Sequence, residues 1–560
     1  MNRTSAFSAV VLFAVTLAFC APPPEFDLVI RGGEMLDGTG APARRADVGI
    51  KGDRVTAIGD LSARRAGQVI DASGKMVTPG FIDTQGQSGI TLLADGNGES
   101  HIRQGITSEI IGEGSSPALW TEGTSEADAL QRFGLQFDWR SFDGYFQKLE
   151  DRGTSINLGT LVPATMARRE VVGLDNRKAT ADEIRRMEEF VDRGMRAGGF
   201  GLSSALIYPP GSFADTEELI ALARVSARHG GIYISHVRGE SFRVEQAIAE
   251  AIQIGDAAKL PVVIYHLKVG ARKHWGTMPR LTEMIQAAAD RGMKISATQY
   301  PYTAGGTGLA AVLPGWAQEG GRAKMLERLQ DPALRARMRR EIETTIDGWE
   351  NLVVAAGFDG IQIASVPPTA DDSVLGKRIS QIAAERGEDP WDTLFRLLTE
   401  SEGRAGALYH MMSEEDVVNG MRFGLVTIGT DAAALRPEGE LGRGQPHPRA
   451  YGTFPRVLGR YVREQKVIEL REAVRRMTSL AAWQFNIPRR GTLQEGNYAD
   501  VVVFDPATVI DRATFEQPQQ YPVGIAYVIV NGVVTVTPRG HTGARAGRRL
   551  TGPAARPRES

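Results

Sequence analysis

The stretch DTEELIALARVSARHGGIYISH, residues 215–236, contains one complete unit of the predicted fold. Asp215, with Glu218 three residues later, matches a capping box at the start of a helix, and Gly230 can end that helix. The run GIYISH that follows is short and apolar, as expected of a buried strand. The stretch therefore predicts a helix followed directly by a strand.

The same alternation continues along the chain. A helix is predicted from about residue 244 to 254, followed by PVVIYH, LTEMIQAAADRG and MKISATQY (residues 261–266, 281–292 and 293–300). Strands that alternate with helices pair in parallel. The number of units and the length of 560 residues favour an α/β fold of the (β/α)₈ barrel type over an open sheet. No phosphate-type glycine loop opens any of these helices.

Short strand patterns separated by turn residues occupy both ends of the chain, residues 26–78 and 485–540. They predict one composite β-sandwich beside a barrel of residues 79–484. Residues 541–560 are rich in Arg, Gly and Pro and are predicted to be a disordered tail, with a basic interaction arm as the alternative.

The N-terminus predicts export. An apolar run, residues 9–19, follows Arg3 and has the length of a signal-peptide core, too short for a membrane span. Residues 1–21 are therefore predicted to be a signal, which places the protein in a bacterial periplasm. The sequence LAFC at residues 17–20 resembles a lipobox except for Phe19, so a lipid anchor at Cys20 and simple cleavage both remain open. With a net charge of −2, no nucleic-acid partner is expected.

Polar residues end several predicted strands, and the active sites of barrels lie at the C-terminal ends of the strands. These residues are Glu113, His236, His266, Asp431 and the pair Gln85 and Gln87 after Asp83. Two histidines that end consecutive strands can converge on a metal. Alternatives are a solvated Glu113 and an Asp431 that caps the next helix. Gln85 and Gln87 stand where two histidines would form a metal clamp, but amides are poor metal ligands.

At this point the motifs resemble a known family, the metal-dependent amidohydrolase superfamily, in its D-aminoacylase (N-acyl-D-amino-acid deacylase) branch. The resemblance covers about residues 27–532. Its motifs are VTPGFID, QGITSEIIGEG, GLSSALIYPPG, YISHVRGE, HLKVGA, QYPYTAGGTG, TIGTD, HPRAYGTFPRVLG and GNYADVVVFDP. It implies a barrel with a small β-sandwich and the metal-assisted hydrolysis of an amide on the nitrogen of a D-amino acid.

The resemblance also implies roles for individual residues. His236 and His266 correspond to ligands of the tightly held metal, Asp431 to the general base, and Lys268, Tyr300 and Arg449 to substrate contacts. Arg449 suits the free carboxylate of the substrate, because a guanidinium pairs well with a carboxylate. For Lys268 and Tyr300, packing at the rim with a wet polar tip is the alternative.

Two departures from the family stand out. Gln85-Gly86-Gln87 replaces a His-x-His pair that in this branch resembles the ligands of a second, weaker metal. The family's cysteine ligand is absent, since Gly114 aligns with it and Glu113 precedes it. If Glu113 substitutes, two histidines and one carboxylate form a recognised zinc set, with manganese or another divalent ion also admitted. The glutamines are expected to bond the water, the substrate amide or Asp431.

Together these observations predict a hydrolase of N-acyl-D-amino acids or D-amino-acid-containing dipeptides that uses one divalent metal, in the first place Zn²⁺. Its substrate is a small amide with a free carboxylate. A catalytically inactive periplasmic binding protein is the alternative. The Gly- and Pro-rich loop of residues 431–449 is predicted to shape substrate choice, and His447 within it is either a supporting contact or an ordinary loop residue. The oligomeric state stays open.

Overall fold

A computed structural model describes residues 23–119, 125–345 and 348–556. The predicted signal and Cys20 lie outside these residues. Within them, no helix is both long enough and apolar enough to cross a membrane. Parallel strands form a closed barrel, in the order β8 (Phe81–Asp83), β9 (Ile106–Ile111), β10 (Asn157–Thr160) continued by β11 (Val162–Pro163), β12 (Gly201–Ala205), β13 (Ile232–His236), β14 (Val262–Ile264), β15 (Ile295–Gln299) and β19 (Val426–Ile428).

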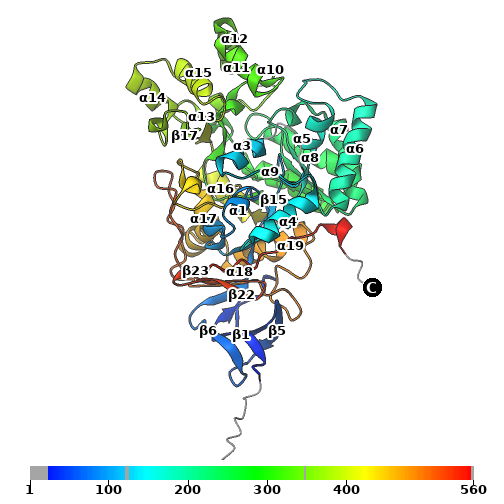
Figure 1. Cartoon of the computed structure of the whole chain (residues 1–560), viewed down its shortest axis with the longest axis vertical. Helices are drawn as coiled ribbons and strands as arrows, with labels where there is room; N and C mark the ends of the chain where they lie inside the picture. Colours follow the sequence, from blue (N-terminus) through cyan, green and yellow to red (C-terminus); the bar gives the residue numbers. More distant parts are fainter. Residues whose placement is uncertain (1–22, 120–124, 346–347, 557–560) are drawn as a thin grey trace, which may run out of the picture.

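The barrel closes between its last and first strands. A parallel bridge joins Gly86 to Ala432, and the hydroxyls of Thr84 and Thr427 lie 3.1 Å apart. Helices cover the outside, among them α4 (Phe142–Arg152), α6 (Ala181–Arg196), α7 (Thr216–Arg228), α8 (Val244–Ala258), α9 (Met278–Asp290), α16 (Glu414–Arg422) and α18 (Leu470–Met477) (Figure 1). The parallel strands and their closure confirm the predicted fold class. The strands are apolar because they are covered on both faces, as is typical of parallel sheets.

The start of α7 differs in one detail from the capping box predicted there. Asp215 accepts a hydrogen bond from the backbone N–H of Glu218, at 3.0 Å, as an N-cap does. The carboxylate of Glu218 does not return to the backbone of Asp215. It bonds the buried guanidinium of Arg168 instead, because a buried cation needs a paired charge.

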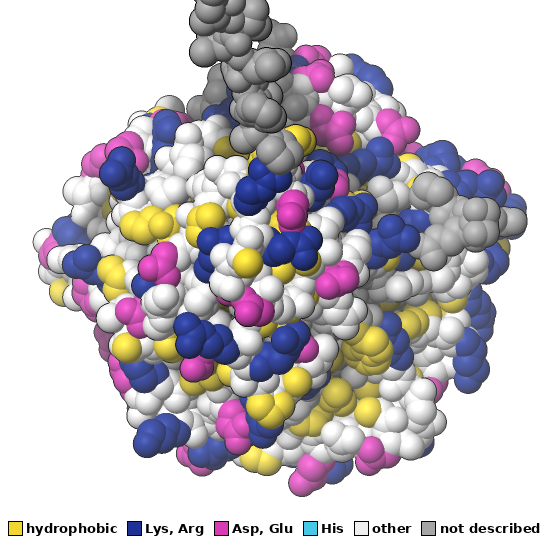
Figure 2. Space-filling model, turned by 90° about the horizontal axis from the view of Figure 1, so that it is seen from below, with side chains coloured by type: hydrophobic (Ala, Val, Ile, Leu, Met, Phe, Trp, Pro, Cys, Tyr) yellow, Lys and Arg dark blue, Asp and Glu magenta, His cyan; other side chains and the backbone are white. Residues whose placement is uncertain are grey.

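Both ends of the chain build the sandwich, at the bottom of Figure 1. Strand β7 (Met76–Pro79) pairs antiparallel with β20 (Val501–Phe504) inside a seven-stranded sheet. A four-stranded sheet of β1 (Phe26–Arg31), β4 (Asp47–Lys51), β5 (Arg54–Gly59) and β6 (Ala66–Asp71) packs against it through a shared apolar core. On this side of the molecule, positive and negative side chains are interspersed rather than segregated by sign (Figure 2).

An insertion between β15 and β19 stands above the barrel (Figure 1). It has its own apolar core. Its elements are β16 (Gly305–Gly308), α10 (Gly315–Gln318), α11 (Arg322–Gln330), α12 (Pro332–Thr344), α13 (Leu352–Ala356), β17 (Ile361–Ser365), α14 (Ile379–Arg386), α15 (Pro390–Glu400) and β18 (Gly406–Tyr409). Tyr409, the last residue of β18, and the first three residues of β16 line the cavity described below, so the insertion contributes to the site.

The prediction of a disordered tail is wrong for residues 541–556. The N–H of Leu158 donates to the carbonyl of Arg548 at 2.9 Å, and Leu550 is buried in the barrel core. Arg549 pairs with Asp143 at 2.7 Å. The prediction of disorder rested on the small number of apolar residues in the tail. Backbone hydrogen bonds and ion-paired arginines hold the tail against the barrel instead.

Candidate active site

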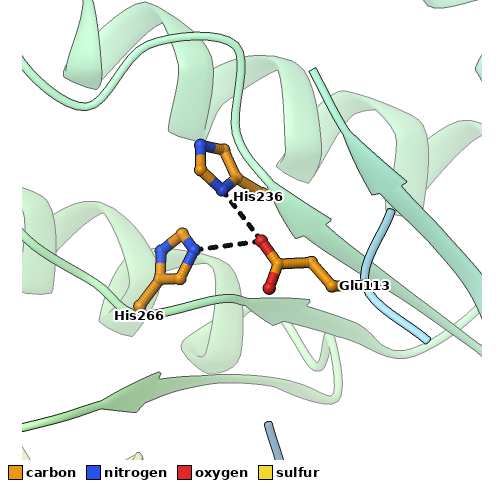
Figure 3. A group of neighbouring side chains, drawn as sticks. All are labelled: Glu113, His236 and His266. Carbon is orange, nitrogen blue, oxygen red and sulfur yellow. Dashed lines mark hydrogen bonds and ion pairs between the residues drawn. The ribbon is translucent and has the colours of Figure 1, made fainter. Parts of the chain in front are cut away.

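Three side chains from three different strand ends meet in the barrel mouth (Figure 3). His236 ends β13, His266 follows β14 by two residues, and Glu113 follows β9 by two. Glu113 Oε1 lies 2.9 Å from His236 Nδ1 and 3.2 Å from His266 Nε2. All three are buried. The structure therefore assembles a potential set of metal ligands, with their donor atoms within 4.8 Å of one another.

Glu113 is ionised in this setting. Burial opposes its charge, but the neighbouring charge of His266 and hydrogen bonds from His236 and His266 hold its pKa well below the ordinary value. An ionised carboxylate beside two imidazole nitrogens is the donor set of many catalytic zinc sites.

Gln85 and Gln87 hold the other oxygen of the same carboxylate. Gln87 Nε2 donates to Glu113 Oε2 at 2.9 Å, and Gln85 Nε2 lies 3.4 Å from it. The amide of Gln85 is fixed in this sense, because its Oε1 accepts from Thr298 Oγ1 at 2.6 Å and from the N–H of His266 at 3.2 Å. The glutamine side chains thus bond Glu113, and not Asp431 as expected among the alternatives. Only the backbone carbonyl of Gln85 reaches Asp431, by accepting its N–H at 2.8 Å.

A second buried group supports the glutamine loop, and two of its members, Glu109 and His101, were given no role in the sequence analysis. Asp83 accepts the N–H of Gln85 at 3.0 Å, and Glu109 accepts the N–H of Ser88 at 2.9 Å. His101 Nδ1 lies 3.0 Å from Glu109. Burial, reinforced by the charge of Glu109, raises the pKa of Asp83 to about 6. The one signal in the sequence was an acidic residue in the otherwise uncharged strand ITSEII.

Gly86 explains why this loop carries a glycine between its glutamines. A Cβ atom at Gly86 would lie 1.9 Å from Glu109 Oε1. Any side chain there would displace the carboxylate that accepts the N–H of Ser88. The close approach of backbone and buried carboxylate therefore requires glycine.

Asp431 and Arg449 form an ion pair across the cavity, with 2.7 Å between Asp431 Oδ2 and Arg449 Nη1. Burial raises the pKa of Asp431 although the charge of Arg449 opposes the shift. Two guanidinium nitrogens of Arg449, Nε and Nη1, are buried without a well-aligned hydrogen bond. Arg449 is therefore placed to bind a further anion besides Asp431.

Tyr300 lies directly after β15, beneath two cations. Arg449 stands 4.6 Å and Lys268 5.6 Å from the centre of its ring. Its hydroxyl is buried and has no hydrogen-bond partner among the described residues. A buried hydroxyl that lines a cavity and lacks a partner is suited to bond a ligand.

Lys268, expected to contact substrate, has two protein partners. Its Nζ lies 2.6 Å from Glu240 Oε1 and 2.6 Å from His266 Nδ1. Glu240, which sequence reasoning missed, also lies 2.8 Å from His266 Nδ1 and 3.7 Å from His236 Nε2. One carboxylate thus faces the outer nitrogens of both histidines. Such outer carboxylates set the tautomer and ring orientation of metal-ligating histidines.

Glu240 is itself held in place. Its N–H donates to Glu350 Oε2 at 2.9 Å, and its carbonyl accepts the N–H of Gly270 at 2.7 Å. Burial and Lys268 oppose the charge of His266, but Glu240 and Glu113 outweigh them and raise its pKa to about 9. A metal would therefore have to displace a proton from His266.

His447 supports Arg449. Its Nδ1 accepts the N–H of Arg449 at 3.0 Å, while its Nε2 lies 2.9 Å from the carbonyl of Ala304. Of the two alternatives left open for His447, the structure favours the supporting contact. His410 lies 2.9 Å from Gln362 and does not line the site.

These residues surround one cavity of about 440 Å³. Its charged lining is provided by Glu113, His236, Glu240, His266, Lys268, Asp431 and Arg449, joined by Arg169. A concave site with convergent polar groups and shifted pKa values is the usual form of an active site. All the metal-ligand and substrate-contact residues expected from the sequence lie at or beside this cavity.

Comparisons with known proteins agree with this architecture. The amidohydrolase family model matches residues 68–536. The D-aminoacylase of Alcaligenes xylosoxydans xylosoxydans is 36% identical over 533 residues, which cover 95% of this chain and 98% of the relative.

Two solved structures are similar over nearly their whole length. A D-aminoacylase structure, described by a binuclear metal centre with one-metal activation and second-metal attenuation, is 35% identical with a TM-score of 0.78, covering 94% of this chain and 100% of the other. The N-acyl-D-glutamate deacylase of Bordetella bronchiseptica, complexed with zinc and a phosphonate inhibitor, is 33% identical with a TM-score of 0.78, covering 94% and 99%. The chain therefore belongs to the amidohydrolase family, in the branch of the D-aminoacylases and N-acyl-D-amino-acid deacylases.

Proposed function

We propose that this protein hydrolyses the amide bond of N-acyl-D-amino acids or of dipeptides that contain a D-residue. Water adds its hydroxyl to the acyl carbon and its proton to the amide nitrogen, the C–N bond breaks, and a carboxylic acid and a free amine leave. The observation that carries the proposal is the convergence of Glu113, His236 and His266 opposite the pair of Asp431 and Arg449. An inactive binding protein would not need this convergence.

The residues present fit one divalent cation. Two imidazole nitrogens face the same carboxylate oxygen at 2.9 and 3.2 Å, and zinc is the ion that such a set suits best, with manganese as the alternative. When bound, a divalent cation polarises a carbonyl group and lowers the pKa of water. Glu113, His236 and His266 would hold it, and Glu240 would orient the two histidine rings.

The other roles belong to residues of the cavity. Asp431 accepts a proton from water and returns it to the leaving nitrogen, a task that its raised pKa favours. The free hydroxyl of Tyr300 donates to the developing oxyanion. Arg449 shares its guanidinium between Asp431 and the substrate carboxylate. Lys268 donates a hydrogen bond to Glu240. Its positive charge also attracts the carboxylate of the substrate.

The Gln-x-Gln loop supports a one-metal site. In this chain the side-chain amides of Gln85 and Gln87 donate to Glu113 Oε2. These two donors satisfy this oxygen without a second cation. The replacement of His-x-His by Gln85 and Gln87 therefore removes one metal and keeps the remaining carboxylate oriented.

The proposal is tested by metal analysis together with a substrate panel. We expect the purified protein to contain close to one equivalent of divalent metal and to hydrolyse N-acetyl-D-amino acids. The matched control is the L-enantiomer of each substrate, and D-residue dipeptides separate a deacylase from a dipeptidase. Metal-free protein that cleaves none of these amides would refute the proposal.

The glutamine loop gives a separate prediction. Gln85→Ala should weaken metal binding by about ten- to a hundredfold, the usual effect of losing a group that orients a ligand, because Glu113 loses a fixed neighbour. Gln85→His/Gln87→His should take up additional metal without a requirement for it in activity. Equilibrium dialysis with zinc measures both. Complete loss of metal in Gln85→Ala would show that the ligands are assigned wrongly.

We further propose that the protein acts after export, as the signal in residues 1–21 predicts. Wall fragments that end in D-amino acids would then be accessible to it. Fractionation of cells that express the full chain tests this location.

A further inference from the structure

A second cavity, of about 450 Å³, adjoins the active-site cavity on the same end of the barrel. It is lined by the loops after β8, β9 and β19, by the end of α3 (Ser125–Arg132), and by the end of β17. Its larger apolar side chains are Ile90, Ile111, Pro117, Phe133, Leu435 and Leu441. We call this second cavity the apolar groove.

The groove is adjacent to the candidate active site. Gln87 and Ser115 line both cavities, and the amide of Gln87 bonds Glu113 at 2.9 Å. One side chain, Gln87, thus contacts a predicted metal ligand and also lines the groove.

The two cavities differ in chemistry. Lys268, Asp431 and Arg449 line only the first cavity. The charged residues that line the groove are Arg132 and Arg443, and both pair with Glu440, at 2.8 and 3.5 Å. The groove thus offers an apolar surface. Both of its arginines already pair with Glu440, so neither is available to bind the carboxylate of a substrate.

An N-acylated amino acid has matching halves. Its free carboxylate belongs with Arg449 in the first cavity, and its acyl chain extends from the other side of the scissile carbonyl. We propose that the apolar groove is an acyl-chain subsite, and that substrates with a linear aliphatic acyl chain of medium length are preferred over N-acetyl compounds. This inference rests on the proposed function and specifies its substrate class.

The test compares N-octanoyl and N-acetyl derivatives of the same D-amino acid. We expect the octanoyl compound to have a kcat/KM at least about tenfold higher, since each fully buried methylene is worth about fourfold. Leu435→Glu should lower the octanoyl-to-acetyl ratio by about tenfold, because a carboxylate opposes burial of the chain. Leu435 is half-buried in the groove, so a longer polar side chain there can reach solvent.

Val533→Glu is the matched control. Val533 is 43% exposed on β22 (Val533–Thr537) of the sandwich, far from the groove in sequence and in the fold. This variant should keep the wild-type ratio. An equal effect of both substitutions would overturn the proposal, and so would a wild-type ratio near one or a ratio that Leu435→Glu leaves unchanged.

Calorimetric titration with octanoate and with acetate separates this inference from the proposed function. Tighter binding of octanoate that Leu435→Glu abolishes would support the subsite even if no amide were cleaved. Equal, weak binding of both acids to wild type and variant would refute the subsite even if N-acetyl-D-amino acids were cleaved rapidly.

Discussion

A protein with the substitutions His236→Ala and His266→Ala is expected to purify almost free of metal and to lose kcat by about a thousandfold or more, because the Lewis-acid contribution of a bound metal is worth several kcal/mol. Two of the three residues that face one another at the barrel mouth would be gone, and Glu113 would keep only its glutamine donors. Elemental analysis and steady-state kinetics measure the two effects together.

The control for this double variant is the substitution of a histidine outside the cavity. His229 directly follows α7 and lies 2.7 Å from Asp192, and it does not line the cavity. His229→Ala should retain metal and activity. Thermal unfolding checks that the double variant is folded, since a buried carboxylate that loses its partners destabilises the native state. A folded double variant with wild-type metal content would contradict the proposed ligand set.

Asp431→Asn is expected to lower kcat by roughly a hundredfold to ten-thousandfold, the contribution of a positioned general base, while the metal content stays unchanged. Asparagine keeps the size of the side chain but cannot accept the proton. Asp431 is not one of the grouped ligands, so metal binding should not depend on it. Its neighbour Arg449 loses a charged partner, and KM for the substrate carboxylate should change as well.

The pH dependence of Asp431 gives a second readout of the same variant. Burial raises the pKa of Asp431 above its ordinary value of 3.8. A base works only when it is deprotonated, so wild-type activity should fall as the pH falls through this raised pKa. The Asn variant should lose this acidic limb of the profile. Asp511, which pairs with Arg456 at 3.0 Å outside the cavity, provides the control Asp511→Asn. A kcat within tenfold of wild type in Asp431→Asn would argue against its role as the base.

Much of the fold could be predicted because its signals are local. The helix and strand of residues 215–236 follow from periodicity and capping within a few residues, and successive units of this kind require a parallel sheet. His236 and His266 could be selected for the same reason, since the ends of consecutive strands meet at one edge of a barrel.

Contacts between distant loops could not be predicted in this way. Glu240 received no role in the sequence analysis, yet it faces two histidines and Lys268. Glu109 and His101 pair beneath the glutamine loop although they lie on different elements. The docking of the tail was missed for the same reason, because composition does not report which partner a polar group will find.

The amino-acid sequence was sufficient for the barrel, for the strands that carry the site, and for the residues at their ends, because side-chain periodicity is a property of short segments. The orientation of those side chains depended on packing between segments far apart in the chain. Glu113 faces the histidines through one oxygen because Gln85 and Gln87 hold the other, and their loop is held by Asp83 and Glu109. A hydrogen bond needs both partners at a fixed distance and angle, and only the folded chain brings them there.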